Sequence, residues 1–342
     1  MKALRKLTAA PGADIVDIPI PKAGPHDLIV KVKATAMCKS DVDVYEWGPL
    51  IAEANYKTPF TMGHEYAGEV VEVGELVKNF KPGDRIAGET HIPCGYCYEC
   101  RTGNQHICRN GMRVLGRTHD GCFAEYIQVP EITGIKLPPD ADFIEASLLE
   151  PLGTALHALQ KAEPSGKRIG ILGVGTIGLM AVELAKALGA TQIFTLDINE
   201  ARLEQSLKLG ADVAINGLKQ DFVEEVRKHT KQLDAVVDLT GNMKVINQAI
   251  DALGVAGRLV HVGMVERELV IPNYMYRVVY RELILTGLFG RNMFSTWELL
   301  NKIMEAKKVD LSAYVGKVMP LAEYETAIKV FDDLLGRAIL IP

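Results

Sequence analysis

Four cysteines within 15 residues offer the clearest chemistry in this 342-residue chain. Their spacing is Cys94-x2-Cys97-x2-Cys100-x7-Cys108. Thiolates two residues apart curl around one ion, and a fourth thiolate from further along closes a tetrahedron. Four sulfur ligands leave no open coordination position, so the pattern predicts a structural zinc site. An iron–sulfur cluster is the alternative, although the proline that follows the last cysteine in ferredoxins is missing.

A second set of candidate ligands is scattered through the first half of the sequence. It consists of Cys38, His64, Glu65 and Glu150. Together these residues supply one sulfur, one nitrogen and two carboxylates, which zinc accepts as ligands. Taken singly each has an ordinary explanation, because a lone cysteine is usually a small core residue and a lone histidine more often forms hydrogen bonds. The spacing alone does not bring the four together.

A glycine-rich turn predicts nucleotide binding. Gly173, Gly175 and Gly178 follow a predicted strand and open a predicted helix. Such glycines let the backbone approach a pyrophosphate, and the helix N-terminus supplies N–H donors to it. A turn that only packs closely is the alternative, and the strand–turn–helix context argues against it.

An acidic residue at the right distance indicates which dinucleotide is bound. Asp197 ends the next predicted strand, 24 residues after Gly173. A carboxylate there accepts hydrogen bonds from the ribose hydroxyls of NAD and repels the extra phosphate of NADP. We therefore predict NAD as the cofactor. Arg202, five residues further on, keeps NADP open because its guanidinium would pair with that phosphate.

Strands and helices alternate after residue 167, and the expected elements imply a doubly wound parallel sheet. Asn199 stands where the N-cap of the second helix would be. Strands are predicted at 169–172, 192–196, 213–215, 234–239, 258–262 and 283–288, and helices at 177–188 and 200–209.

The rest of the chain has a different pattern. Residues 1–150 contain short valine-bearing runs cut by glycine and proline, which is typical of an irregular β-rich domain. We expect the nucleotide-binding domain to cover 151–290. In 291–342 we expect helices at 295–306 and 322–335 and a final strand at 338–341, and we predict that this tail returns to the first domain.

Charge and hydropathy exclude several classes of function. The formal net charge is −5 and the basic residues are scattered, so neither nucleic acid nor an anionic membrane is an expected partner. The longest uncharged, mostly apolar run has 14 residues, whereas a membrane span needs about 20. The N-terminal residues lack the apolar core of a secretory signal, so we expect a cytoplasmic protein with a small-molecule substrate.

Several landmarks, in their order along the chain, resemble the zinc-containing medium-chain dehydrogenase superfamily. These are Cys38 with Ser40-Asp41, Gly63-His64-Glu65, the turn Lys81-Pro82-Gly83-Asp84, the four-cysteine lobe and the glycine turn. Within the superfamily, Tyr45-Glu46-Trp47, Gly88-Glu89-Thr90-His91, Gly121-Cys122-Phe123-Ala124-Glu125-Tyr126 and the segment 290–297 are similar to the threonine dehydrogenase family. The resemblance implies a GroES-like catalytic domain joined to a Rossmann domain.

The resemblance also assigns roles to residues. It implies that Cys38, His64 and Glu65 bind a catalytic zinc ion and that Glu150 is a fourth ligand or a nearby relay carboxylate. His91 matches a position beside the substrate. Cofactor contacts are expected at Gly173, Gly175, Ile177, Gly178, Asp197, Arg202, Val262, Gly263, Met264, Leu288 and Phe289. Homotetramer assembly follows from the same likeness, and Cys122 is interpreted as a core residue.

The implied activity is oxidation of a secondary alcohol, with hydride transfer to NAD. L-threonine is the substrate that the resemblance favours. Ser40 is expected to take the hydroxyl proton, and Asp43 stands where the family has a relay histidine, so either it continues the relay or it is a solvated charge. Two alternatives stay open: a dehydrogenase of polyols, sugar alcohols or diols, and a protein that binds NAD without catalysis.

Overall fold

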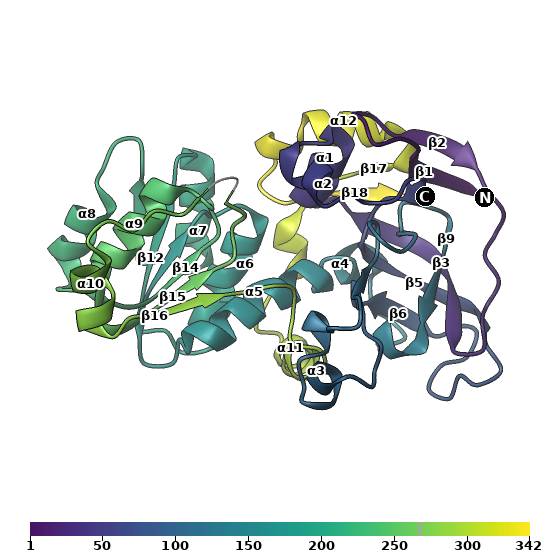
Figure 1. The fold of residues 1–342 in the computed structure, drawn as a ribbon, viewed down its shortest axis with the longest axis horizontal. Coiled ribbons are helices and arrows are strands. Elements are labelled where there is room, and N and C mark those ends of the chain that lie inside the picture. Colours follow the sequence, from purple (N-terminus) through teal and green to yellow (C-terminus); the bar gives the residue numbers. More distant parts are fainter. Residues whose placement is uncertain (266–267) are drawn as a thin grey trace. The chain divides into compact units, whose positions relative to one another are not determined.

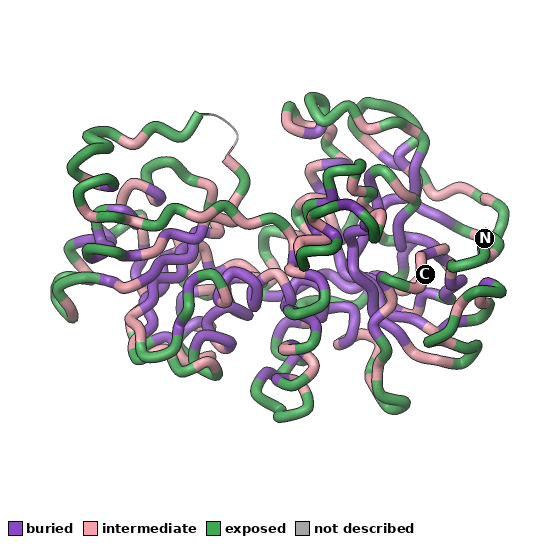
Figure 2. Tube along the Cα trace, turned by 60° about the horizontal axis from the view of Figure 1, so that its bottom comes forward, coloured by how far each residue is buried: buried purple, intermediate pink, exposed green. Residues whose placement is uncertain are grey.

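The computed structural model describes residues 1–265 and 268–342, and these form two compact units. The first unit comprises 1–151, 292–297 and 310–342, and the second comprises 152–291 and 298–309. Buried residues lie in the interior of each unit, on strands and on helices (Figure 2). The expected combination of a β-rich GroES-like domain and a Rossmann domain is confirmed.

The first unit is built mainly from antiparallel strands (Figure 1). Its largest described sheet has the order β10-β6-β5-β3-β18-β17, with β9 also paired to β3. A smaller sheet has the order β2-β1-β4, and β7 pairs with β8. The strands are β1 (Lys2–Lys6), β2 (Asp14–Asp17), β3 (Asp27–Ala36), β4 (Phe60–Thr61), β5 (Glu65–Val73), β6 (Arg85–Gly88), β7 (His91–Ile92), β8 (Arg113–Val114), β9 (Tyr126–Pro130), β10 (Gly134–Lys136), β17 (Val315–Pro320) and β18 (Arg337–Ile341).

Short helices connect these strands, and a longer helix leads out of the unit. Between the largest sheet and its neighbours, alternating apolar residues form one core around Leu28, Val30, Val70 and Phe123. The helices are α1 (Lys39–Glu46), α2 (Pro49–Glu53), α3 (Tyr98–Arg101), α4 (Phe143–Ala146), α5 (Leu149–Ala162) and α12 (Tyr324–Lys329), with 3-10 turns at Gln105–Ile107, Glu131–Thr133, Leu311–Tyr314, Leu321–Glu323 and Phe331–Asp333.

The second unit contains a parallel sheet of six described strands in the order β13-β12-β11-β14-β15-β16. Every paired register in it is parallel, and the strand order reverses at β11, as expected for a doubly wound fold. Its strands are β11 (Arg168–Leu172), β12 (Gln192–Asp197), β13 (Val213–Asn216), β14 (Leu233–Asp238), β15 (Leu253–His261) and β16 (Ile284–Gly287). Its helices are α6 (Thr176–Ala187), α7 (Glu200–Leu209), α8 (Phe222–His229), α9 (Met243–Ala252), α10 (Tyr274–Arg277) and α11 (Ser295–Glu305), with a 3-10 turn at Val279–Arg281.

The strands and the helix cap predicted for this unit are present in the structure. All six predicted strands occur, and each observed end lies within five residues of its expected position. Asn199 caps α7, since its side-chain oxygen accepts a hydrogen bond from the backbone N–H of Arg202. No helix among the described residues combines the length and apolar character needed to cross a membrane.

The C-terminal tail corrects one prediction. The helix expected at 322–335 is wrong in length, because α12 covers only Tyr324–Lys329 and 3-10 turns flank it on both sides. A strand that the sequence did not predict, β17, lies before it and pairs in parallel with β18. The helical spacing of apolar residues in this segment therefore reflects short turns. These turns pack apolar side chains, among them Ala327 and Ile328, onto the core of the first unit.

In the glycine turn, the backbone at residue 178 passes very close to the backbone at residue 173, and only glycine allows this at position 178. A Cβ atom on Gly178 would lie 2.0 Å from the carbonyl oxygen of Gly173, which itself has a φ of +88°. At Gly175, by contrast, a Cβ atom would meet nothing within 4 Å. The first turn of α6 can therefore pack against β11 only when residue 178 lacks a side chain.

We predict that Gly178→Ala destabilises the nucleotide-free protein by about 1–3 kcal/mol, as overpacking does elsewhere. Gly175→Ala is the matched control, because its φ of −64° suits any residue. Thermal unfolding without nucleotide compares the two. Equal melting temperatures for both variants would contradict the packing argument.

Candidate metal and dinucleotide sites

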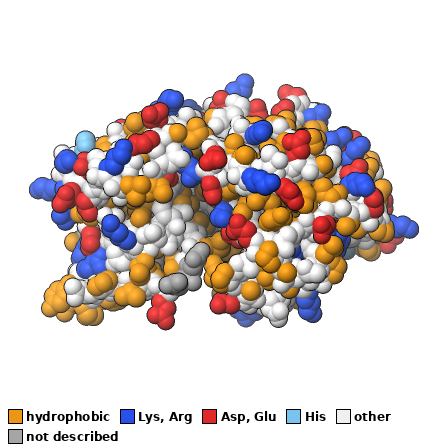
Figure 3. Space-filling model, turned by 90° about the horizontal axis from the view of Figure 1, so that it is seen from above, with side chains coloured by type: hydrophobic (Ala, Val, Ile, Leu, Met, Phe, Trp, Pro, Cys, Tyr) orange, Lys and Arg blue, Asp and Glu red, His pale blue; other side chains and the backbone are white. Residues whose placement is uncertain are grey.

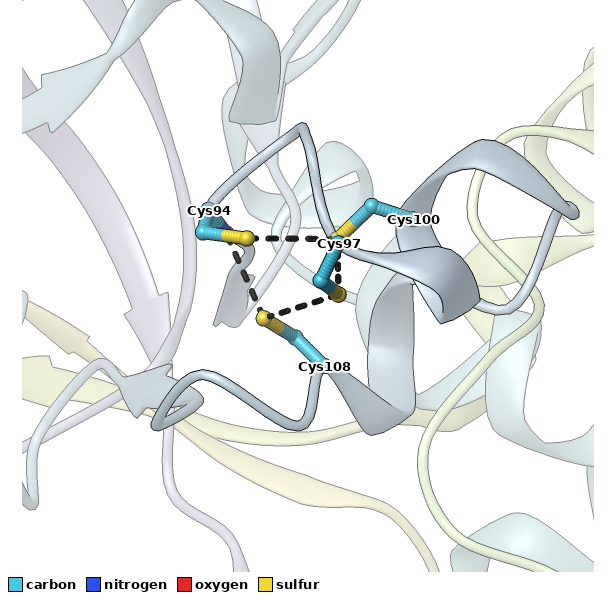
Figure 4. A group of neighbouring side chains, drawn as sticks. All are labelled: Cys94, Cys97, Cys100 and Cys108. Atoms are coloured by element: carbon cyan, nitrogen blue, oxygen red, sulfur yellow. Dashed lines mark hydrogen bonds between the residues drawn. The ribbon is translucent and has the colours of Figure 1, made fainter.

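The four cysteines of the lobe converge on one point, as Figure 4 shows. Sulfur–sulfur distances are 3.4 Å for Cys97–Cys100, 3.8 Å for Cys97–Cys108 and 3.9 Å for Cys94–Cys100. A zinc ion bonded to four tetrahedral sulfurs at about 2.3 Å would separate them by about 3.8 Å. These separations are far longer than a disulfide bond, so the lobe has the dimensions of a single-ion site.

The second group, Cys38, His64 and Glu65, is assembled by strand pairing. The end of β3 pairs with the start of β5, with Ala36 opposite Glu65, so Cys38 and the His64–Glu65 pair reach the same end of the sheet. One ligand atom from each lies within 4.8 Å of the others. Glu65 Oε2 is buried without a hydrogen-bond partner. A buried carboxylate oxygen with no partner is costly, and a metal ion would satisfy it.

Arg337 supplies positive charge to this group. It begins β18, which pairs with the other edge of β3, and its Nη2 atom lies 2.9 Å from Glu65 Oε1 and 3.7 Å from Cys38 Sγ. Burial raises the pKa of the Cys38 thiol, but Arg337 and His64 together lower it to about 6. The thiolate that a metal requires therefore forms near neutral pH.

His64 is oriented by a buried carboxylate. Its Nδ1 atom lies 3.1 Å from Asp41 Oδ1, and the second oxygen of Asp41 accepts a hydrogen bond of 3.0 Å from the backbone N–H of Cys38. Burial raises the pKa of Asp41, but His64 and Arg117 lower it to about 2, so the carboxylate stays ionised. Hydrogen bonding at Nδ1 leaves Nε2 as the atom that faces a metal.

Glu150 lies near this group without belonging to it. Its Oε1 atom accepts a hydrogen bond of 2.6 Å from Thr90, whose hydroxyl is also 3.2 Å from the His64 carbonyl oxygen. Burial raises the pKa of Glu65 well above its ordinary value, and the negative charges of Cys38 and Glu150 raise it further. Glu150 is thus close enough to influence the ionisation of Glu65. Its two expected roles, fourth metal ligand and relay carboxylate, both stay predictions.

His91 lies in a buried hydrogen-bonded cluster. Glu89 Oε1 is 2.6 Å from His91 Nδ1, and Glu89 Oε2 accepts a hydrogen bond of 2.8 Å from Trp297 Nε1. All three residues are less than 5% exposed. The cluster fixes the ring of His91 and fastens the returning segment 292–297 to the first unit.

The proton-relay candidates lie on α1. Ser40 is in the first turn of this helix, two residues after Cys38. Asp43 forms an ion pair of 3.2 Å with Lys39. Burial raises the pKa of Asp43, and the charges of Lys39 and Arg117 oppose that rise. Asp43 is therefore a half-buried, paired carboxylate.

The dinucleotide candidates lie at the carboxyl ends of the parallel strands. Asp197 ends β12, and its two oxygens accept hydrogen bonds from the backbone N–H groups of Val174, Ile198 and Asn199. This ties the carboxylate to the glycine turn at the N-terminus of α6. Across the sheet, Gly263 packs against Gly241, and the backbone N–H of Leu288 donates to the carbonyl oxygen of His261. Met264 and Phe289 are more than half exposed, and the side chain of Ile177 is partly exposed.

Some residues that shape the sites were not found from the sequence. Arg117, Arg337, Thr90 and Glu89 are buried and bonded to predicted site residues, and Trp297 is bonded to Glu89. Glu89, Thr90 and Trp297 stand in segments that carried the family resemblance, but no role was predicted for them, and Arg117 and Arg337 belong to no motif. Their burial was the missing signal, since arginine, threonine and glutamate are ordinarily surface residues.

Comparison with known proteins gives the same assignment. The alcohol dehydrogenase GroES-like domain model matches residues 24–139, and the zinc-binding dehydrogenase model matches 176–306. L-threonine 3-dehydrogenase of Symbiobacterium thermophilum is 40% identical over 100% of this chain and 98% of its own length, and that of Caldanaerobacter subterraneus subsp. tengcongensis is 38% identical over 100% and 99%. The crystal structure of 2R,3R-butanediol dehydrogenase from Bacillus subtilis superposes with a TM-score of 0.89 at 29% identity, covering 100% of this chain and 99% of that one.

The chain therefore belongs to the zinc-dependent medium-chain alcohol dehydrogenase superfamily. It is an alcohol dehydrogenase of the class that uses zinc and a nicotinamide dinucleotide, and the predicted family is confirmed.

We predict two zinc ions per chain, held at separate sites. Cys97→Ser should reduce the content to one ion and lower the melting temperature, because a structural zinc ion contributes directly to folding. Cys38→Ser should also leave one ion, but with a smaller loss of stability, because the sheet around it has its own core. Metal analysis by mass spectrometry together with thermal unfolding checks both. Two ions retained in either variant would contradict the assignment.

Proposed function

We propose that the enzyme oxidises the C3 hydroxyl of L-threonine to the ketone of 2-amino-3-oxobutanoate, with NAD as hydride acceptor. The observation that carries this proposal is the 38–40% identity to L-threonine 3-dehydrogenases along the whole chain. The group formed by half-buried Cys38 and buried His64 and Glu65 supports it, because these ligands supply the chemistry that alcohol oxidation needs.

Cys38, His64 and Glu65 would hold the catalytic zinc ion, and Cys94, Cys97, Cys100 and Cys108 the structural one. A zinc ion with an open coordination position acts as a Lewis acid that lowers the pKa of a hydroxyl group. The chain's own contribution is to hold these ligands in place and to favour the thiolate of Cys38. Asp41 holds the His64 ring, and Arg337 balances the charges of Cys38 and Glu65. Glu150 is proposed as a fourth ligand or as a nearby relay carboxylate.

Ser40 is proposed to accept the proton that the substrate hydroxyl gives up. Its place in the first turn of α1 puts it two residues from the proposed metal ligand Cys38. Asp43 lies one turn further along the same helix, and we propose that it passes the proton on through water. Its ion pair with Lys39 opposes the rise in the pKa of Asp43 that burial causes.

NAD is proposed in preference to NADP. Asp197 is held by three backbone N–H groups, of which that of Val174 belongs to the glycine turn. As a carboxylate it has further lone pairs for two ribose hydroxyls. Its charge would repel a ribose phosphate. Arg202 supports the alternative, since it lies in the first turn of α7 just after this carboxylate.

The amino acid substrate requires partners for its ammonium and carboxylate groups. We propose His91 as a residue beside the substrate, with its ring fixed by Glu89. The second candidate function is oxidation of a diol or polyol, which the likeness to 2R,3R-butanediol dehydrogenase favours.

We also propose that copies of the chain associate, with a homotetramer as the expected form. The edge strand β16 is unpaired on its outer side within the described sheet, and Ile284 and Leu285 are 40% and 38% exposed. Tyr276 and Tyr280 beside it are 72% and 66% exposed, and hydrophobic side chains gather at the lower left of Figure 3. An exposed apolar edge favours pairing with a second copy across a two-fold axis. A mass of 37.4 kDa by light scattering would contradict association.

The proposed location is the cytoplasm. All six cysteines are free thiols, and four of them are arranged as metal ligands, which suits a reducing compartment. Fractionation of cells that produce the protein tests this, and recovery outside the cytoplasm would contradict it.

We predict that L-threonine is oxidised with NAD at a much higher kcat/KM than 2,3-butanediol or sorbitol. Butanediol keeps the secondary alcohol but lacks the two charged groups, so it isolates their contribution. The measurement is NADH formation with each substrate at equal concentration. A higher kcat/KM with a diol or polyol would overturn the threonine assignment and support the second candidate.

We predict that Ser40→Ala lowers kcat by about 100-fold or more, as loss of a general acid–base group does, with the dissociation constant for NADH unchanged. Ser165→Ala, at an exposed position, is the matched control. Stopped-flow turnover and NADH fluorescence titration provide the two measurements. Unchanged turnover in Ser40→Ala would exclude the relay role.

A further inference from the structure

Arg117 is a buried arginine beside the proposed catalytic site that belongs to no motif. Its side chain is 7% exposed. Nη1 donates to the Gly116 carbonyl oxygen at 2.7 Å and to Asp41 Oδ1 at 3.4 Å. Nη2 donates to the Ser40 carbonyl oxygen at 2.7 Å. One guanidinium therefore joins the residue that holds His64 to the backbone of the proposed relay serine.

The loop that carries Arg117 is fastened to the backbone beside His64. Cβ atoms placed on Gly116 and Gly121 would lie 2.6 Å and 2.1 Å from the Gly63 carbonyl oxygen, so both positions require glycine for this approach. Backbone hydrogen bonds from Cys122 to Gly63 and from Gly121 to Thr61 hold the same contact. The loop is thus positioned by the segment 61–64, which carries His64 between β4 and β5, and Arg117 reaches α1 from there.

The bond to Asp41 acts on His64. Asp41 Oδ1 lies near both the His64 ring and Arg117, while Oδ2 is bound by the Cys38 backbone N–H. Without Arg117, a fully buried carboxylate would lose its nearest permanent positive charge. Partners of this kind set the orientation and the basicity of a histidine that binds a metal.

The bond to the Ser40 carbonyl oxygen acts on α1. Ser40 is in the first turn, where helix geometry is weakly fixed because few intrahelical bonds exist there. The guanidinium fork has two ends in one rigid plane. It therefore sets the distance between the Ser40 backbone on the helix and the Asp41 carboxylate that orients His64.

We propose that Arg117 is a positioning residue for the reaction, which aligns the Ser40 hydroxyl with the metal ligand His64. This inference rests on the proposed function for its kinetic consequences, while its effect on His64 and the metal stands apart from the substrate. A lysine at this position keeps the charge but cannot bind Asp41 and the Ser40 carbonyl in one plane. A glutamine loses the charge as well.

The test compares Arg117→Lys and Arg117→Gln with Arg113→Gln, an exposed arginine in β8 that leads into the same loop. Three quantities are measured: zinc release to a chelator from the two-zinc protein, turnover with its solvent isotope effect, and the NADH dissociation constant. We expect Arg117→Gln to release one of its two zinc ions and to lose turnover by about 10- to 100-fold, the usual effect of removing a group that orients a metal ligand.

For Arg117→Lys we expect zinc retention close to the parent protein, a turnover loss of similar size and a changed solvent isotope effect. NADH affinity should stay unchanged in all three variants. Arg113→Gln should match the parent in every measurement.

Turnover, isotope effect and zinc release in Arg117→Lys that all equal those of the parent would overturn the inference. If Arg117→Gln does not fold, the lysine variant still decides. If the parent protein oxidises no alcohol, the proposed function fails, but zinc release in the Arg117 variants still shows whether this residue supports His64.

Discussion

Burying several negative charges around one point is the constraint on which the first unit depends. Cys38, Glu65, Glu150 and Asp41 lie in or beside one group, and an unpaired buried charge is very costly. Two buried arginines, far apart in the sequence, supply compensating positive charge. Arg337 pairs with Glu65, and Arg117 pairs with Asp41. A metal ion would add the remaining positive charge. The side chains that would bind it already lie close together in the protein without metal.

The sheet topology brings these charges together. In the order β5-β3-β18, three adjacent strands deliver Glu65, Cys38 and Arg337 to one end, although they are separated by up to 299 residues in sequence. This explains why the C-terminal segment belongs to the first unit. Without β18 the group of proposed ligands would keep the negative charges of Cys38 and Glu65 but lose the positive charge of Arg337. The tail is therefore part of the site's electrostatics as well as of its core.

The sequence was informative where a signal is local. The Cys94–Cys108 spacing, the glycine turn and the Asn199 cap each depend on neighbours within a few residues, and the structure has each of them in the expected form. The parallel sheet followed from the alternation of predicted strands and helices.

Cys38, His64 and Glu65 could be united only by resemblance, because β-strand pairing is a long-range event. Arg117 and Arg337 could not be found at all, since nothing in their local sequence reports burial. The tail helix was overestimated because helical spacing in 322–335 does not distinguish one helix from successive short turns.

The central claim is that Cys38, His64 and Glu65 bind one zinc ion. X-ray absorption at the zinc edge tests it most directly, when applied to a variant whose four-cysteine lobe has been removed so that a single ion remains. Zinc coordination by these three residues predicts one sulfur neighbour at about 2.3 Å and nitrogen and oxygen neighbours at about 2.0–2.2 Å. A spectrum with sulfur neighbours only, or a variant that binds no zinc, would contradict it.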